Sequence, residues 1–197
     1  ALLDFWREVE RKTGLQIRYH ERVEAITRDG SGFIVRTTRG EYRTTSVLLA
    51  IGRRGTPRKL GVPGEELPKV VYRLVDPDQY VGQDLLVVGG GDSALEAAAS
   101  LAENGSRSVT LSYRGDSFSR AKPKNRERIA AAEKVGRLRV LFSSEVRRIE
   151  RDRVVLASAG RDVDLSNDAV IVSAGGVLPS EFLRGIGIEV ETKYGTA

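Results

Sequence analysis

The stretch Asp84–Gly105, DLLVVGGGDSALEAAASLAENG, has the pattern of a β-strand, a glycine-rich turn and an α-helix. Residues 84–88 include an apolar run that is typical of a strand covered on both faces. Residues 92–104 carry apolar side chains at helical spacing, and Gly105 stands where such a helix ends. The stretch therefore predicts a strand that leads through a tight turn into a helix.

The turn matches the dinucleotide-binding fingerprint G-x-G-x-x-G/A. Its residues are Gly89, Gly90, Gly91, Asp92, Ser93 and Ala94. In this motif Gly89 would make the tight turn, Gly91 would let a pyrophosphate approach the backbone, and Ala94 would keep the helix close to the strand. Asp92 or Ser93 could cap the helix, whose first N–H groups attract phosphate. We expect a dinucleotide site here, although similar turns occur in methyltransferases and in folds without a ligand.

The next predicted strand covers residues 108–113, and the residues at and after its end indicate which of the two nicotinamide dinucleotides, NAD or NADP, would bind. A NAD site usually has an Asp or Glu about 20 residues after the fingerprint, but Tyr113 and Arg114 stand there, and more basic residues follow: Arg120, Lys122 and Lys124. A guanidinium pairs with a 2′-phosphate through charge-assisted hydrogen bonds. This predicts NADP, with a solvated basic surface as the alternative, and it disfavours a methyltransferase. We expect no nucleic-acid partner, because interleaved aromatic side chains and recognition motifs are missing.

The elements along the rest of the chain predict an α/β protein with a parallel sheet. Before the stretch we expect a helix, a strand, a β-meander that ends in a buried strand, and an extended crossing: residues 2–14, 15–20, 21–51 and 52–69. From Asp84 the order is strand, helix, strand, helix, strand. An antiparallel meander follows over residues 143–165, and a second buried strand with its crossing over 168–179.

Composition removes several classes of site. The chain of 197 residues has no cysteine and one histidine, His20, so disulfides, thiolate metal sites and histidine-based triads are not expected. We predict no metal site and no catalytic side chain. No apolar run approaches the roughly 20 residues that span a bilayer, and no signal-peptide pattern is present, so we expect a cytoplasmic protein without a membrane partner. Methionine is also absent, and we expect the chain to be an excised piece of a longer protein.

With these residues in view, the chain resembles the two-dinucleotide-fold flavoproteins that include thioredoxin reductase and bacillithiol-disulfide-reductase-like proteins. The resemblance rests on VVGGGDSALEAA, on SYRGDSF, and on the paired crossings LAIGRRGTP…GVPGE and VIVSAGGVLP, the second of which contains Gly175. It implies that Tyr113, Arg114, Gly115 and Asp116 occupy the family's HRRD phosphate-binding segment. Arg120 would replace the charge missing at Gly115, and Glu96 would lie near the nicotinamide.

The resemblance also implies a domain organisation. We expect a Rossmann-like three-layer NADP-binding domain with a flanking β-meander, inserted into an incomplete FAD-domain sheet. The predicted boundaries are 1–66 for the first part of the FAD domain, 67–168 for the NADP(H) domain, and 169–197 for the return. The family's FAD fingerprint and its Gly-Asp motif are missing, so we expect FAD in the parent protein but no tight FAD binding by this chain.

The function implied is the NADPH-binding part of an FAD-dependent oxidoreductase that passes hydride from NADPH to flavin, and then to an unknown electron acceptor. The Cys-x-x-Cys pair of thioredoxin reductase is missing, because the chain contains no cysteine. A non-catalytic NADP-binding module for redox sensing or assembly is the alternative. We also expect the chain to self-associate, since its two buried strands would lack neighbours and leave apolar surface.

Overall fold

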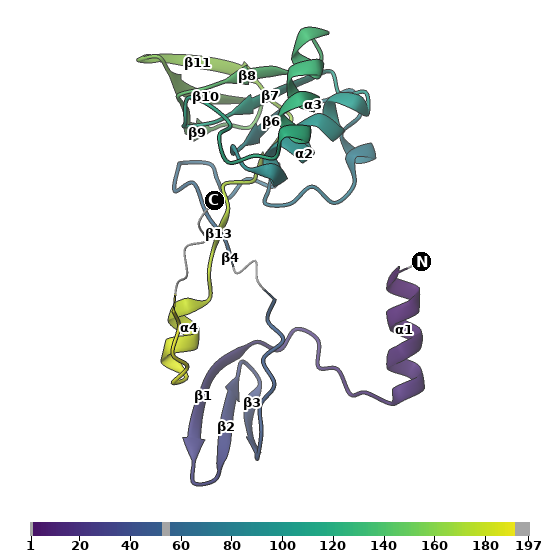
Figure 1. The fold of residues 1–197 in the computed structure, drawn as a ribbon, viewed down its shortest axis with the longest axis vertical. Coiled ribbons are helices and arrows are strands. Elements are labelled where there is room, and N and C mark those ends of the chain that lie inside the picture. Colours follow the sequence, from purple (N-terminus) through teal and green to yellow (C-terminus); the bar gives the residue numbers. More distant parts are fainter. Residues whose placement is uncertain (1, 53–55, 192–197) are drawn as a thin grey trace. The chain divides into compact units, whose positions relative to one another are not determined.

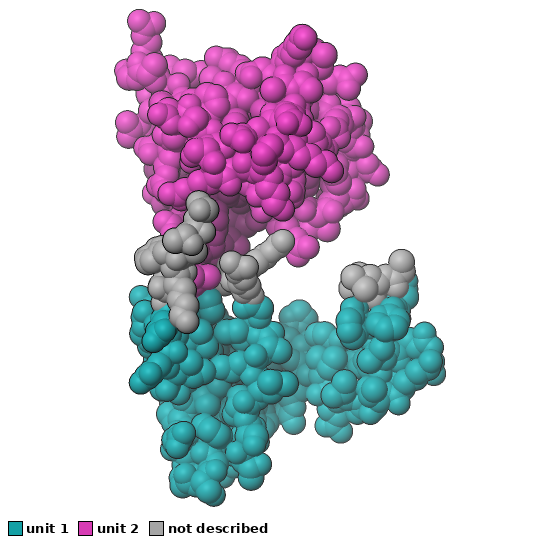
Figure 2. All heavy atoms as spheres, in the orientation of Figure 1, with its two compact units in different colours: residues 1–52, 179–197 teal, residues 53–178 magenta. Residues whose placement is uncertain are grey.

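The computed structural model describes residues 2–52 and 56–191 (Figure 1). Contacts divide the chain into two compact units, the smaller comprising residues 1–52 and 179–197 and the larger comprising residues 53–178 (Figure 2).

The larger unit is built on a five-stranded parallel sheet of order β5-β12-β6-β7-β8. Its strands are β5 (Val70–Val71), β6 (Asp84–Val88), β7 (Ser108–Ser112), β8 (Arg139–Leu141) and β12 (Ala169–Val172). Helix α2 (Asp92–Glu103) joins β6 to β7, and α3 (Pro123–Lys134) lies between β7 and β8 (Figure 1). The predicted strand–helix–strand–helix–strand order and the parallel sheet are confirmed.

Side chains alternate across this sheet and create two apolar cores. Leu85 and Val87 pack with α2 and α3 in one core, whereas Leu86 packs in the other. That second core includes the antiparallel sheet β11-β10-β9, whose strands are β9 (Ser144–Ile149), β10 (Arg153–Ser158) and β11 (Arg161–Ser166). Because the side-chain period of a strand is two, one sheet serves both cores. The unit is therefore the expected three-layer α/β fold with a flanking meander.

Strand β12 differs from the expectation for residues 169–172. All four of its residues are buried, and it lies between β5 and β6 rather than in a separate sheet. Asp168, just before β12, accepts a hydrogen bond from the backbone N–H of Asp84 at 2.8 Å, which aligns the starts of β12 and β6. The expected open apolar surface at this strand was wrong. The domain boundaries at 66/67 and 168/169 stay a prediction for the whole protein.

The smaller unit contains α1 (Leu2–Thr13), a three-stranded antiparallel sheet and α4 (Ser180–Gly185). The sheet consists of β1 (Val23–Asp29), β2 (Gly32–Thr37) and β3 (Gly40–Thr44). The first helix and the first two meander strands are confirmed, but the strands expected over 15–20 and 46–51 were wrong. The Thr37 hydroxyl accepts a hydrogen bond from the Gly40 N–H at 3.2 Å, which turns the chain early. Residues 40–44 therefore become the third strand.

The two crossings pair with each other within the larger unit. Strand β4 (Thr56–Pro57) is antiparallel to β13 (Gly176–Val177), and a short 3-10 helix, η1 (Pro77–Tyr80), precedes β6. Across the described ranges, no helix has the length and apolar character needed to cross a membrane.

Gly64 provides a test of this packing. Its φ is +83°, and a Cβ there would lie 1.8 Å from the carbonyl oxygen of Ile149 at the end of β9. We expect Gly64→Ala to lower the free energy of unfolding by at least about 3 kcal/mol, measured by urea denaturation. Gly136→Ala is the matched control, because Gly136 also has a left-handed φ of +72° but faces open space. This variant should cost only about 1 kcal/mol, and equal losses would contradict the packing.

Candidate functional site

The glycine turn lies where the order of strands in the parallel sheet reverses. The chain runs from β6 to β7 and β8 on one side, and returns to β12 on the other side of β6. In open α/β sheets, ligands bind outside the carboxyl ends of the strands at such a switch point. Gly89 follows β6 and Ser173 follows β12, and the Ser173 N–H donates to the carbonyl of Val88 at 2.7 Å.

Each glycine of the turn has a different environment. Gly89 has φ +145°, and a Cβ there would lie 2.4 Å from the Ser173 carbonyl oxygen and 3.0 Å from Ala94 Cβ. A Cβ on Gly90 would lie 2.3 Å from the ring of Tyr113. Gly91 is exposed, and its Cβ would meet no atom within 4 Å. The first two glycines are thus required by packing, and the third leaves its approach open.

Helix α2 starts at this open position. Gly91 is its N-cap residue and makes no side-chain hydrogen bond to the first turn. The buried residues of α2, including Ala94 and Leu95, hold the helix against the sheet. Ser93, in the first turn of the helix, is exposed. The first N–H groups of an α-helix have no partner within the helix and attract anions. The start of α2 can therefore bind a phosphate group.

Asp92 does not cap its own helix but binds the start of α3. Its carboxylate accepts hydrogen bonds from the Lys122 backbone N–H and from the Asn125 amide, both at 2.8 Å. The same amide donates to Glu96 at 3.0 Å. Glu96, expected near a nicotinamide, is thus an exposed residue of α2 that contacts α3. Asn125 was missed from the sequence, because nothing local marks it as the bridge between these helices.

These contacts change the acidity of Asp92. The Lys122 N–H, together with the Asn125 amide, lowers the pKa of the Asp92 carboxyl below its usual range. A lowered pKa in the folded state stabilises the fold at pH values above the unfolded pKa. This contribution is lost only as the pH falls through the lowered value, so the contact between α2 and α3 is intact at neutral pH.

The residues after β7 form a second part of the site. The Tyr113 ring stacks on Phe118 with centroids 5.7 Å apart. It also lies against Gly115, where a Cβ would approach the ring to 2.6 Å. Arg114, which stands between Tyr113 and Gly115 in the sequence, is exposed. The aromatic ring thus fills the space above the turn, and the guanidinium is left accessible beside it.

Arg114 lines a cavity of about 230 Å³ that the sequence did not indicate. Arg120 and Lys122 are exposed but do not line it. Gly175, with φ +87°, is exposed after β12, and its carbonyl accepts from the Arg58 N–H at 3.0 Å. The structure therefore gathers the glycine turn, Tyr113 and Gly175 around the carboxyl ends of three strands. Arg120 and Lys122 lie in the loop before α3.

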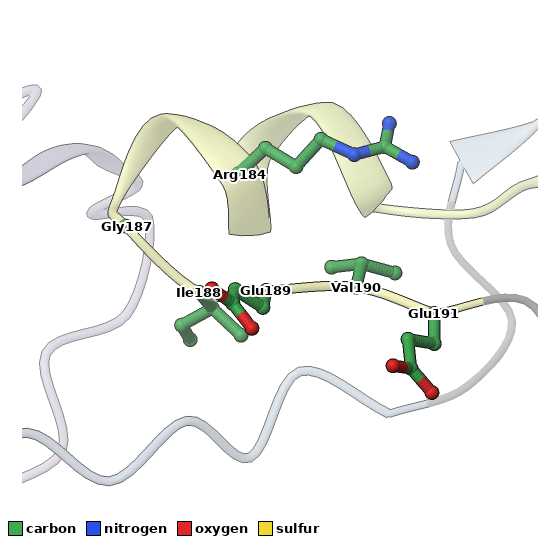
Figure 3. A pocket seen from close by; sticks show the side chains of 6 residues that line it. All are labelled: Arg184, Gly187, Ile188, Glu189, Val190 and Glu191. Carbon is green, nitrogen blue, oxygen red and sulfur yellow. The ribbon is translucent and has the colours of Figure 1, made fainter.

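A second space of about 410 Å³ lies in the smaller unit and has a different character. It is lined by Arg184 of α4 and by the segment Gly187–Glu191 (Figure 3). None of the predicted site residues lines it. In the described part of the chain, no group of three or more His, Cys, Asp or Glu residues could hold a metal ion.

Comparison with known proteins gives consistent matches over nearly the whole chain. The sequence profile of the family described as pyridine nucleotide-disulphide oxidoreductase matches residues 1–196. Bacilliredoxin reductase Bdr of Bacillus subtilis is 31% identical over 98% of this chain and 60% of its own length. A ferredoxin–NADP reductase of Ignicoccus hospitalis is 33% identical over 95% of this chain and 62% of its own length.

Solved structures agree with these matches. Bacillithiol disulfide reductase Bdr from Bacillus cereus superposes with a TM-score of 0.81 and 31% identity, covering 96% of this chain and 60% of that one. Bacillithiol disulfide reductase Bdr from Staphylococcus aureus superposes with a TM-score of 0.80 and 30% identity. The match covers 98% of this chain and 59% of that one. The resemblance and the fold class expected from the sequence are confirmed. The chain spans about 60% of the length of these relatives.

Replacing the two outer glycines of the turn should separate their roles. Gly89→Ala should lower the free energy of unfolding by more than about 2 kcal/mol, because its Cβ would meet the Ser173 carbonyl. Gly91→Ala should stay within about 0.5 kcal/mol of wild type, because its φ of −96° suits any residue and the space is open. Thermal denaturation of both variants checks this. A destabilised Gly91→Ala with an unaffected Gly89→Ala would contradict the described turn.

Proposed function

The chain belongs to the pyridine nucleotide-disulphide oxidoreductase family, and we propose that it forms the NADPH-binding portion of an FAD-dependent oxidoreductase. One observation carries the proposal: a glycine turn at the switch point of a parallel sheet opens into an uncapped helix start. Bound NADPH would supply a hydride for the flavin of the whole protein. The residues of this chain would bind and orient the dinucleotide.

The proposed pyrophosphate site is the turn Gly89–Gly91 with the first turn of α2. Gly91 fits this role because the space that its Cβ would occupy is empty. Ser93 is exposed in the same turn and can donate a hydroxyl. Asp92 would act indirectly, because its carboxylate is engaged by the Lys122 N–H and the Asn125 amide at the start of α3. The backbone would thus supply the donors, and the net dipole of α2 the attraction.

The proposed 2′-phosphate reader is Arg114. It stands at the end of the strand next to β6, where a NAD site would have a carboxylate. Arg120 and Lys122 are exposed in the loop that follows and would add positive charge. Tyr113 would support the site by packing on Gly90. We therefore propose NADPH as the nucleotide.

The electron acceptor and the flavin site are proposed for the whole protein. The relatives include a bacilliredoxin reductase and ferredoxin–NADP reductases, so we propose another redox protein as the acceptor. The absence of cysteine means that this chain contributes no redox-active thiol. The smaller unit lacks, within its described residues, a strand–glycine turn–helix unit that could hold FAD, so retention of FAD by this chain is not expected. The cytoplasmic location expected from the sequence stays a prediction.

Nucleotide selectivity tests the proposal. In calorimetric titrations the chain should bind NADP⁺ more tightly than NAD⁺. Arg114→Ala should lose about 1.5–3 kcal/mol of NADP⁺ binding, as expected for a charge-assisted contact, and should leave NAD⁺ binding unchanged. Gly91→Ala should weaken both nucleotides, because its methyl group would fill the phosphate approach.

Arg137→Ala is the matched control for charge. Arg137 is also exposed, but it precedes β8 and so lies at the opposite edge of the sheet. The Arg137→Ala variant should bind NADP⁺ and NAD⁺ with the affinities of the wild-type chain. Equal wild-type affinities for NADP⁺ and NAD⁺ would make the basic segment a solvated surface, and the absence of binding would remove the proposed site.

Exposed apolar side chains of the smaller unit support self-association of the chain on its own. Leu48 is 92% exposed, and Leu15, Ile17 and Ile51 are also exposed. Sedimentation at tens of micromolar, an estimate from typical association-prone concentrations, should show dimers or larger species, reduced in Leu48→Ser. Val135→Ser, which removes an exposed valine of the larger unit, is the control and should change nothing. A monomeric wild-type chain would contradict this proposal.

A further inference from the structure

We propose that Arg147 is a second reader of the NADP 2′-phosphate, acting with Arg114 across the cavity beside β7; this inference rests on the proposed function. The cavity has a volume of about 230 Å³. It is smaller than the roughly 300–1,000 Å³ of a pocket that encloses a whole ligand, so it suits one group of a longer molecule. The lining residues that bear on its chemistry are Arg114, Ser143, Glu145, Arg147 and Ala159.

The charges of this cavity favour a phosphate group. Two guanidinium groups and one carboxylate, that of Glu145, line it, which leaves one net positive charge. Within residues 2–52 and 56–191, neither Arg114 nor Arg147 forms an ion pair. The neighbouring Arg148, in contrast, lies 2.7 Å from Glu150. Two uncommitted guanidinium groups facing one small space match the donor pattern that binds phosphate.

A β-bulge explains how Arg147 reaches the cavity. In the pairing of β9 with β10, Val146 is opposite Leu156 and Arg148 is opposite Val155, so Arg147 has no partner. As a result Arg147 and Arg148 are both exposed, while Val146 and Ile149 on either side are buried in the core. A bulge changes the direction of a side chain without giving up the packing around it. Here it frees Arg147 to face the segment that carries Arg114.

Backbone hydrogen bonds fix the two sides of the cavity relative to each other. The Ser143 N–H donates to the Gly115 carbonyl at 2.9 Å, and the Ser144 N–H donates to the Tyr113 carbonyl at 3.1 Å. The residues on both sides of Arg114 are therefore bound to the segment that leads into β9. A site held in this way needs little reorganisation to bind its ligand.

Two further features fit a ligand site. A side chain at Gly115 would crowd the Tyr113 ring, and Arg120 and Lys122 do not line the cavity, so Arg147 is the cation that faces it together with Arg114. In the part of the chain that the structure describes, three non-glycine residues have a positive φ, and two of them, Ser143 at 47° and Ala159 at 50°, line this cavity. Ala159 owes its φ to the two-residue turn that joins β10 to β11, so Ser143, whose N–H donates to the Gly115 carbonyl, is the residue whose backbone strain fits a binding site.

The test uses the 197-residue chain and calorimetric titration with NADP⁺ and NAD⁺. Arg147→Ala should weaken NADP⁺ about 10-fold or more and leave NAD⁺ within about twofold, as expected for loss of one charge-assisted contact. Adenosine 2′,5′-bisphosphate and adenosine 5′-monophosphate should show the same difference. Arg148→Ala, on the same strand but outside the cavity, is the control and should change neither affinity.

A second variant is expected to raise the affinity for NADP⁺, and this distinguishes a role in binding from a simple loss of folding. Glu145→Gln removes the carboxylate that repels a phosphate in the cavity, and it should tighten NADP⁺ about threefold without changing NAD⁺. Misfolding cannot produce such a gain. Unchanged or weaker NADP⁺ binding in Glu145→Gln would contradict the assigned cavity.

The remaining outcomes separate this inference from the proposed function. If Arg114→Ala loses the NADP⁺ preference while Arg147→Ala keeps it, the inference is wrong and the proposed function stands. If Arg147→Ala weakens both nucleotides alike, Arg147 does not read the 2′-phosphate and the inference is also wrong. If the wild-type chain does not prefer NADP⁺, both fall together.

Discussion

The parallel pairing of β12 with β6 is the constraint on which the site depends. It brings the carboxyl ends of two strands that are distant in sequence to the same edge, so that the carbonyl of Ser173 lies against Gly89. A methyl group at Gly89 would separate them, and φ +145° is a conformation that side chains disfavour. The tight turn in turn sets where α2 begins and leaves Gly91 open to a phosphate.

Around this turn, aromatic packing and charge have separate tasks. The Tyr113 ring fills the space over Gly90 and Gly115, so a side chain at either position would require the ring to move. The two cations that line the cavity come from different segments, Arg114 from the segment after β7 and Arg147 from the bulge of β9. The proposed site thus combines a centre of glycine backbone and one aromatic ring, which suits a backbone-bound pyrophosphate, with exposed guanidinium groups that suit a second phosphate.

Local patterns in the sequence predicted much of this structure, and partners distant in sequence account for the rest. The strand, turn and helix of Asp84–Gly105 and the meander that follows could be predicted from period and glycine placement. The position of residues 169–172 between β5 and β6 could not be predicted, because an apolar run fits a buried strand of this parallel sheet as well as one of a separate sheet. The bridge made by Asn125 and the proposed role of Arg147 could not be predicted for a related reason, because an inter-helix bridge and a β-bulge depend on packing and strand pairing. The strand expected over residues 46–51 failed because the Thr37–Gly40 turn placed the third strand earlier.

The most direct test of the account is ³¹P NMR of NADP⁺ bound to the chain, followed as a function of pH. The 2′-phosphate of free ligand has a second pKa near 6, as for other phosphate monoesters. Beside guanidinium groups it should stay dianionic to lower pH, with its pKa shifted down, and the pyrophosphate resonances should also move on binding. A bound ligand whose 2′-phosphate titrates as in free solution would contradict recognition of that phosphate by this site.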